Sequence, residues 1–257
     1  MDQEYTASYK KILVEAGNQV NFMGSFFRNI FRMNFEWNEF VRQCYMIGYK
    51  SFPIIGITGF IVGFVMTLQS LPTMKEFGAE SYIPKMVAIS LIREICPVII
   101  ALICAGKISS GIGAELGSMK VSEQIEAMDV SGANPIQYLV VTRVLACIFM
   151  VPLLTLMADT LGLAGSFVAV NVSSDVSGIL FFHKAFNSVE FGDLLPAVIK
   201  TVFFGLAIGF VGCYKGYNSD RGTESVGIAA NSAVVSASLW IIVIDGIAVQ
   251  LTNALGY

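Results

Sequence analysis

The feature that most constrains the fold is a run of 24 uncharged residues between Lys50 and Lys75. As an α-helix this run would be about 36 Å long at about 1.5 Å per residue, enough to cross a hydrocarbon core about 30 Å thick. The composition agrees, because only 14% of the 257 residues are charged, against about 25% in soluble domains. We therefore expect an integral membrane protein.

Four further apolar stretches are long enough to cross a bilayer, so the sequence predicts one all-α membrane domain over residues 1–257 with about five spans. The more polar segment 171–193 is expected outside the bilayer, with a short helix near residues 179–186. Lys200 lies near one end of its stretch, where a long side chain can snorkel to the interface. The predicted spans are 52–74, 85–107, 136–170, 196–215 and 227–254.

The region of about residues 20–50, before the first span, begins with an amphipathic pattern. Its polar face carries Asn21, Ser25 and Arg28. Such a helix is expected to lie in the interface plane, although an ordinary amphipathic surface helix has the same pattern. The apolar face comprises Phe22, Met23, Phe26, Phe27, Ile30 and Phe31.

The distribution of basic residues predicts the orientation. With the N-terminus in the cytoplasm, eleven of the 16 Lys and Arg residues fall on the cytoplasmic side, as the positive-inside rule requires. Five spans then place the C-terminus on the periplasmic side. An odd number of spans also suggests that a second copy of the chain completes a pathway.

Several function classes are excluded by composition. A net charge of −3 offers no basic surface for nucleic acid. The five cysteines form no CxxC pair, and the single histidine, His183, makes a histidine metal site or a catalytic triad hard to assemble. Gly106-Lys107 lacks the spacing of a phosphate-binding loop. We expect no enzyme activity and no cofactor in this chain.

Arg93 and Glu94 are the costliest residues of the predicted spans, since an arginine at mid-membrane costs about 2.5–3.5 kcal/mol on an insertion scale. Neighbours in a helix point about 100° apart, so the two side chains should turn towards a polar cavity or another helix. One interpretation is contact with a polar head group or a gate, and the other is a structural pair that locks helices together. Pro97 predicts a kink nearby.

Two other patterns leave alternatives open. Small residues four apart, at Gly59 and Gly63, Gly205 and Gly209, and Gly212 and Gly216, allow close helix packing, either inside one chain or across a dimer. Asp159 and Asp245 lie in predicted spans and could relay protons. An ion-coupled secondary transporter is therefore an alternative. An intramembrane enzyme acting on lipid is disfavoured, because no nucleophile and base occur together.

The loop 112–132 predicts a short helix in the cytoplasm. Ser122 can cap it, with Glu123 and Gln124 in the first turn. Ile125 and Met128 form an apolar pair, and Gly132 ends the helix. Such a helix suits insertion into a groove on a soluble partner, whereas the alternative is a surface helix that lies on its own protein.

Three motifs make the sequence recognisable: R-E-x-x-P from Arg93, A-E-x-G-x-M from Ala114 and E-Q-I-x-A-M from Glu123. Within the segment from Leu91 to Ala146 they resemble, in register, the MlaE or YrbE family of ABC-transporter permeases. Weaker similarity extends over nearly the whole chain. A departure is Lys107, where arginine is common in the family.

The resemblance implies a homodimeric permease of the inner membrane that moves phospholipid between the inner and outer membranes. The implied partners are an ABC ATPase of the MlaF type, which holds ATP and Mg, an MCE-domain protein of the MlaD type and a STAS-domain subunit of the MlaB type. Import of a sterol or another lipid is an alternative within the family.

The resemblance also assigns residues to two sites. The lipid cavity would be bordered by Arg93 and Glu94, with Gln69, Met74 and Phe77 as further lining. The ATPase would contact Glu115, Ser122, Glu123, Gln124, Ile125 and Met128.

Overall fold

The computed structural model describes residues 2–30, 35–173 and 177–254, and all the regular elements in these ranges are helices. The expected all-α fold is confirmed. The longer helices are α1 (Asp2–Ile30), α2 (Trp37–Glu76), α3 (Ile83–Ser90), α4 (Cys96–Cys104), α5 (Ser110–Val121), α6 (Gln124–Val130), α7 (Thr142–Ser173), α8 (Gly178–Ser188), α9 (Phe191–Tyr217) and α10 (Thr223–Ala254). Four short turns of 3-10 or π geometry join them: η1 (Glu80–Tyr82), η2 (Leu91–Ile95), η3 (Ala105–Ser109) and η4 (Ile136–Val141).

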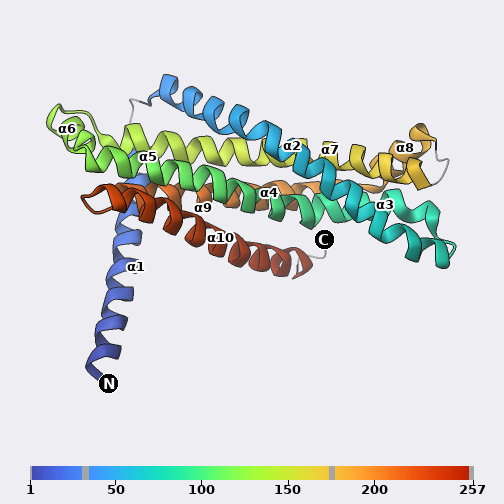
Figure 1. Cartoon of the computed structure of the whole chain (residues 1–257), viewed down its shortest axis with the longest axis horizontal. Helices are drawn as coiled ribbons and strands as arrows, with labels where there is room; N and C mark the ends of the chain where they lie inside the picture. Colours follow the sequence, from blue (N-terminus) through green and yellow to red (C-terminus); the bar gives the residue numbers. More distant parts are fainter. Residues whose placement is uncertain (1, 31–34, 174–176, 255–257) are drawn as a thin grey trace.

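Five helical segments of the described chain are long and apolar enough to cross a membrane, which confirms a multi-pass membrane protein. They run side by side in one elongated bundle (Figure 1). α6 lies at one end of the bundle, and α3 and α8 lie at the other (Figure 1). The segments are Trp37–Glu76, Glu80–Val121, Ile136–Val172, Phe191–Tyr217 and Thr223–Ala254.

The first span begins earlier than predicted, because α2 is continuous from Trp37. The polar residues near its start are satisfied within the helix: the Gln43 side-chain amide donates to the Glu39 carboxylate at 2.7 Å, and Arg42 pairs with the same carboxylate at 3.2 Å. The second half of the predicted interfacial region 20–50 therefore belongs to α2 and is not a separate helix, while the interfacial position of the region stays a prediction.

α1 crosses the end of the bundle rather than running along it (Figure 1). Its apolar face is divided between two environments. Phe26 is buried, and the Phe22 ring packs against Phe210 and Tyr214 of α9 with centroids 5.6 and 5.5 Å apart, whereas Phe27 remains exposed. Phe31, also assigned to this face, lies outside the described residues. α1 is thus anchored to α9 by half of its apolar face.

The second span extends beyond its predicted limits of 85–107, because five consecutive helical segments carry it from α3 to the end of α5. The π turn η2 ends at Ile95, and Pro97 follows in the first turn of α4. A π turn changes the hydrogen-bond register, which is one way to accommodate a proline without breaking the helix. The irregularity expected from Pro97 is therefore a change of helix type.

The glycine pairs serve packing inside the chain. On α2, Gly59 and Gly63 lie against Ala158 and Gly162 of α7. On α9, Gly205 and Gly209 face α7, while Gly212 and Gly216 face Ser109 and Gly113.

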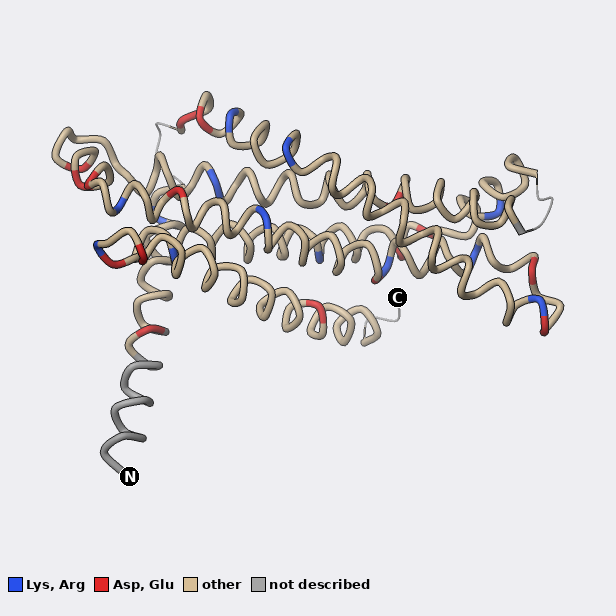
Figure 2. Tube along the Cα trace, viewed as in Figure 1, with Lys and Arg blue, Asp and Glu red and all other residues tan. Residues whose placement is uncertain are grey.

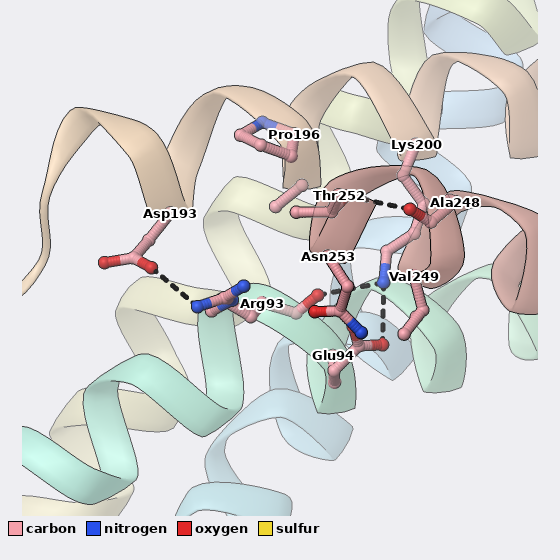
Figure 3. A pocket seen from close by; sticks show the side chains of 10 residues that line it. Arg93, Glu94, Asp193, Pro196, Lys200, Ala248, Val249, Thr252 and Asn253 are labelled. Atoms are coloured by element: carbon pink, nitrogen blue, oxygen red, sulfur yellow. Dashed lines mark hydrogen bonds and ion pairs between the residues drawn. The ribbon is translucent and has the colours of Figure 1, made fainter. Parts of the chain in front are cut away.

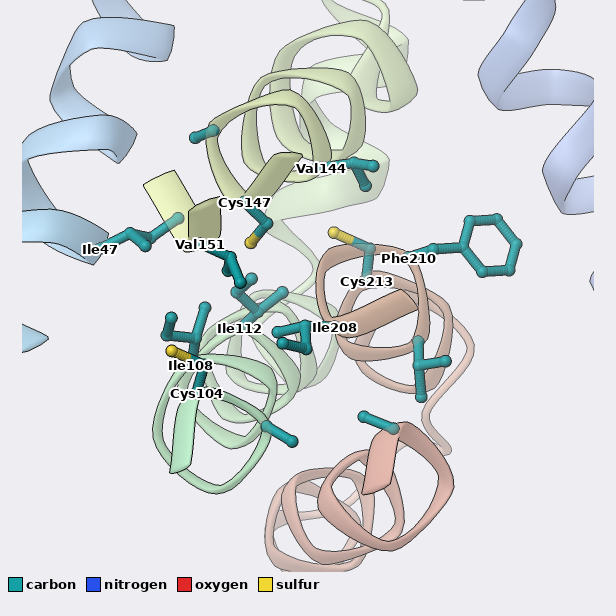
Figure 4. Close-up of a cluster of buried hydrophobic side chains, with 14 of the residues drawn as sticks. Ile47, Cys104, Ile108, Ile112, Val144, Cys147, Val151, Ile208, Phe210 and Cys213 are labelled. Atoms are coloured by element: carbon teal, nitrogen blue, oxygen red, sulfur yellow. The ribbon is translucent and has the colours of Figure 1, made fainter. Parts of the chain in front are cut away.

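The buried apolar cluster between these helices includes the thiols of Cys104, Cys147 and Cys213 (Figure 4). All five cysteines are free.

We expect Gly63→Ala to destabilise the fold markedly. A Cβ at this position would lie 1.9 Å from the Gly162 carbonyl oxygen, so α2 and α7 must separate. Overpacking of this kind costs about 1–3 kcal/mol. The measurement is equilibrium unfolding in detergent micelles. Gly246→Ala in α10 is the control, because a Cβ there meets open space. Equal stability of the two variants would contradict the close approach of α2 and α7.

Candidate functional site

Charged residues concentrate towards the ends of the bundle, and a smaller number lie inside it (Figure 2). The interior residues include Lys200 of α9, whose side chain is only 4% exposed. The expectation that Lys200 snorkels to the interface is wrong. Its Nζ has carboxylate partners within the bundle, which compensate the charge where it lies.

Lys200 sits between two carboxylates. Its Nζ lies 2.8 Å from Oε2 of Glu94 and donates to the Arg93 carbonyl oxygen at 2.9 Å (Figure 3). The same Nζ lies 2.9 Å from Oδ1 of Asp245. These groups come from η2, α9 and α10. One ammonium group therefore connects three helical segments that are far apart in the sequence.

Arg93 turns towards a different partner from Glu94. Its guanidinium lies 3.2 Å from Oδ1 of Asp193 in the first turn of α9 (Figure 3). The other oxygen of Asp193 accepts from the Glu190 backbone N–H at 3.1 Å in a capping box, which fixes the carboxylate. We call Arg93, Glu94, Asp193, Lys200 and Asp245 the intramembrane charge cluster. Its ion pairs link helices, as one of the two interpretations of Arg93 and Glu94 expects.

The charge cluster also borders a cavity of about 40 Å³. Glu94 is 46% exposed and Arg93 is 33% exposed, so the cluster is not sealed inside the protein. With all groups ionised it contains two cations and three carboxylates. A cavity of this size holds a water molecule or a small polar group, not a whole lipid. Apart from the cluster residues, its lining includes Pro196, Ala197, Ala248, Val249, Thr252 and Asn253 (Figure 3).

Three residues that the family resemblance assigns to the same cavity lie elsewhere. Gln69 and Phe77 are exposed near the end of α2, and Met74 packs partly against the apolar cluster formed with α3 and α8. None of the three lines the cavity beside Arg93. Their role as lipid lining stays a prediction.

The two carboxylates considered for proton relay have different surroundings. Asp245 is engaged by Lys200. Asp159 is buried in the middle of α7, and its Oδ1 has no hydrogen-bond partner within the part of the chain that the structure describes. Asp159 lines a separate small cavity with Pro97, Thr155 and Thr201. The two residues therefore do not form a continuous relay by direct contact.

Sequence reasoning missed two members of the charge cluster as partners of Arg93 and Glu94. Asp193 belongs to a segment expected outside the bilayer, and Lys200 is more than a hundred residues from Glu94. The available signal was that Lys200 and Asp245 each interrupt an apolar stretch. Arg143 is 2% exposed and pairs with Glu115 at 3.0 Å, a second ion pair between helices with a buried cation.

The second candidate site is the end of the bundle that carries α6. The predicted coupling loop 112–132 is shorter than expected, because α5 continues to Val121. Gly113 and Gly117 allow α5 to pack closely against the start of α10. Glu115 therefore belongs to α5 and not to the loop.

Ser122 does not cap α6, so that prediction is wrong. Its hydroxyl donates to the Ser118 carbonyl oxygen at 2.8 Å, because Ser122 closes the last turn of α5. Glu123 precedes α6 in a left-handed conformation with φ 57°. Non-glycine residues adopt that conformation infrequently. As predicted, Gly132, with φ 83°, follows the end of α6.

α6 has an anchored face and a free face. Ile125 is buried in the main apolar cluster, and Met128 packs partly against it. Glu123, Gln124 and Val130 are exposed. The apolar pair predicted to enter a partner thus holds α6 on its own protein, and the free face is available for contact.

Ion pairs fix the position of α6. Lys120 of α5 contacts Glu126 at 2.6 Å, and Arg221, just before α10, lies 3.5 Å from Glu123 and 3.9 Å from Glu126. The hydrogen bond from Lys120, with the charge of Arg221, holds the pKa of Glu126 below that of a free glutamate. Asn134, after α6, donates to the Asn29 side-chain oxygen at 2.7 Å. Through this segment, α5, α10 and α1 are connected.

Comparison with known proteins assigns the family. The family profile described as permease MlaE matches residues 40–251. The chain belongs to the MlaE permease family. The match covers all or nearly all of each candidate span, the intramembrane charge cluster and α6. This MlaE-family chain is accordingly the permease subunit of a transporter.

Relatives of the permease support the assignment. A probable ABC transporter permease protein of Rickettsia typhi is 36% identical over 211 residues, which is 82% of both chains. A probable ABC transporter permease protein of Synechocystis is 33% identical over 220 residues, covering 86% of this chain and 84% of the relative. The chloroplastic protein trigalactosyldiacylglycerol 1 of Arabidopsis thaliana is 32% identical over 216 residues, covering 84% of this chain and 62% of the relative.

Proposed function

We propose that this permease moves phospholipids between the inner and outer membranes as the transmembrane subunit of an ABC transporter. The observation that carries the proposal is the intramembrane charge cluster, with the partly exposed Arg93 and Glu94 beside a cavity. Charged groups inside a bilayer are costly and mark sites where polar substrate groups pass. A lipid brings a charged head group to such a site while its acyl chains remain among apolar side chains.

Exposed apolar helix faces suit the tails of the same substrate. α2 exposes Ile54, Ile57 and Ile61 on one side, and α10 exposes Val243 and Ile247. Of an apolar stretch of 18 residues in α10, only 17% is buried inside this chain. We propose that a second copy of the permease covers part of these faces, so that a homodimer encloses a lipid cavity larger than the one beside Arg93.

The driving energy comes, in this proposal, from an ABC ATPase of the MlaF type that holds ATP and Mg. The naming of two relatives as ABC transporter permeases supports an ATPase partner. The exposed face of α6, with Glu123 and Gln124, is the proposed contact. Ile125 and Met128 act from beneath by anchoring α6, and Glu115 acts by holding Arg143. The chain itself performs no covalent chemistry.

We further propose an inner-membrane location, with α6 in the cytoplasm and the C-terminus on the periplasmic side. Lys120 and Arg221 lie at the α6 end, where they contact Glu126 and Glu123, which agrees with the positive-inside rule. An MCE-domain protein of the MlaD type would receive or deliver lipid at the opposite end, and a STAS-domain subunit of the MlaB type would accompany the ATPase. The Arabidopsis relative is named after a glycerolipid, which supports a lipid substrate.

The experiment that tests the substrate uses Arg93→Gln combined with Glu94→Gln. We expect the purified wild-type permease to retain phospholipid and the double variant to retain about tenfold less. That ratio corresponds to about 1.4 kcal/mol, a modest loss for charge-assisted contacts with a head group. Mass spectrometry of extracted lipid gives the amount and the head group. Glu80→Gln combined with Lys85→Gln is the charge-matched control, because both residues are exposed at the α3 end of the bundle and do not line the cavity beside Arg93.

Equal phospholipid retention by the wild type and the Arg93 and Glu94 variant would contradict the proposed head-group contact. Recovery of a sterol in place of phospholipid would support the alternative substrate of the same family. Transport by the purified chain without any ATPase, abolished when an ion gradient collapses, would favour the ion-coupled alternative built on Asp159 and Asp245.

A further inference from the structure

A second lipid-sized feature lies away from the charge cluster, in the corner between α1, α9 and α10. It is a groove with a volume of about 630 Å³, within the roughly 300–1,000 Å³ range of small-molecule sites. We call it the α1 groove. It shares no lining residue with the cavity beside Arg93. Its lining consists of Gln19, Val20, Met23, Gly24, Phe27, Phe203, Leu206, Ala207, Phe210, Val211, Trp240 and Ile244.

The α1 groove is almost wholly apolar, since Gln19 is the one polar side chain of its lining. Ala207, Phe210 and Val211 of α9 form a buried floor. Phe27, Phe203 and Trp240 remain about half exposed along its sides. Such a surface suits a flexible hydrocarbon chain, which can follow an irregular apolar floor without leaving a polar group unsatisfied.

The direction of the groove matches one leaflet of a bilayer. Its floor follows α9 from Phe203, near the middle of the helix, to Val211 towards the α6 end. Eight residues of helix span about 12 Å. Half of a hydrocarbon core about 30 Å thick is about 15 Å. α1, which supplies Gln19, Val20, Met23, Gly24 and Phe27 to the lining, crosses the bundle at the α6 end (Figure 1).

The same geometry disfavours a protein helix as the occupant. A transmembrane helix needs a surface along the full membrane thickness of about 30 Å, but the floor of this groove follows α9 for only about 12 Å. On α1, Arg28 follows Phe27, lies one turn beyond Gly24 and is exposed. Arg28 forms no ion pair with any described residue. A lipid phosphate is the anion that the membrane itself supplies at its surface.

We propose that the α1 groove binds one acyl chain of a phospholipid from the leaflet on the α6 side, with the phosphate near Arg28. This lipid is a resident of the permease and is distinct from the proposed cargo. It fills the space between α1 and the spans, and so holds α1 at the membrane surface. The proposal goes beyond the transport function and does not depend on it.

The chain carries its own reporter, because only two tryptophans occur in the sequence and Trp240 lines the groove. In a Trp37→Phe background, the full-length permease is reconstituted into vesicles of phosphatidylcholine with dibrominated acyl chains, which quench tryptophan fluorescence on contact. Gly24→Leu fills the groove, since a Cβ at Gly24 meets open space. Gly17→Leu is the control on the same helix, because Gly17 also meets open space and does not line the groove.

We expect Gly24→Leu to lower the quenching of Trp240 roughly twofold, since only part of the exposed half of Trp240 lines the groove and the rest keeps its contact with bulk lipid. Trp240 fluorescence in Gly17→Leu should be quenched as strongly as in the parent. Equal quenching in all three proteins would overturn the proposal. Weak quenching in the parent, unchanged by Gly24→Leu, would also overturn it, because it would mean that a second copy covers the groove. Arg93→Gln combined with Glu94→Gln should leave the quenching unchanged, which separates this test from that of the cargo site.

Discussion

Replacing Lys200 with methionine is expected to destabilise the permease by about 3–5 kcal/mol, the cost of removing one partner from a buried ion pair. Lys200 is the cation between Glu94 and Asp245, and methionine leaves both carboxylates uncompensated inside the membrane. Methionine has a similar length, so loss of packing contributes little. The free energy of unfolding in detergent micelles is the measurement, and lipid retention should fall in the same variant.

A triple variant separates charge from packing. Adding Glu94→Gln and Asp245→Asn to Lys200→Met removes the two unpaired charges, and we expect it to regain most of the lost stability. Lys85→Met on the exposed side of α3 should change stability by no more than about 0.5 kcal/mol. If Lys200→Met alone matched Lys85→Met, Lys200 would not compensate the charges of Glu94 and Asp245 as described above.

Replacing Glu123 and Gln124 together with alanine is expected to reduce ATP-driven lipid transfer about tenfold, within the 5–150-fold range of a coupling free energy of about 1–3 kcal/mol. Both side chains are exposed on the free face of α6. A conformational change on the ATPase can move the permease only if its contacts differ between two states. Lipid transfer and ATP hydrolysis are measured in the assembled complex in proteoliposomes.

The control for the α6 variant is Glu80→Ala combined with Ser81→Ala, two exposed positions at the opposite end of the bundle. This pair should transfer lipid at the parental rate. The α6 variant should retain phospholipid normally, because the charge cluster is intact. Unchanged transfer by the α6 variant in an assembled complex would show that another surface carries the coupling.

The spans could be predicted because each consists of apolar residues in a run longer than the bilayer requires. Their ends could not, since the polar residues there find partners along the helix. Glu39 is an example, because its carboxylate accepts a hydrogen bond from Gln43 within the same helix. α2 therefore continues through a charged segment that was predicted to lie at the interface. Local sequence shows the charge but not the partner that compensates it.

The candidate site was predictable as single residues and not as an assembly. Arg93 and Glu94 stand out because charges are rare in apolar stretches, and the prediction that they point apart is confirmed by their separate partners. The partners themselves depend on how α9 and α10 pack against η2, which no local pattern encodes. The failure of Ser122 as a cap has a related cause, because close packing of α5 on α10 extends α5 to Val121.

The measurement that tests the central claim most directly is phospholipid transfer from proteoliposomes that contain the permease, with and without its ATPase. We predict that labelled phospholipid reaches acceptor particles only when permease, ATPase and ATP are all present. ATP hydrolysis by the isolated permease would contradict that claim. Lipid transfer by the permease alone at the full rate would contradict it equally.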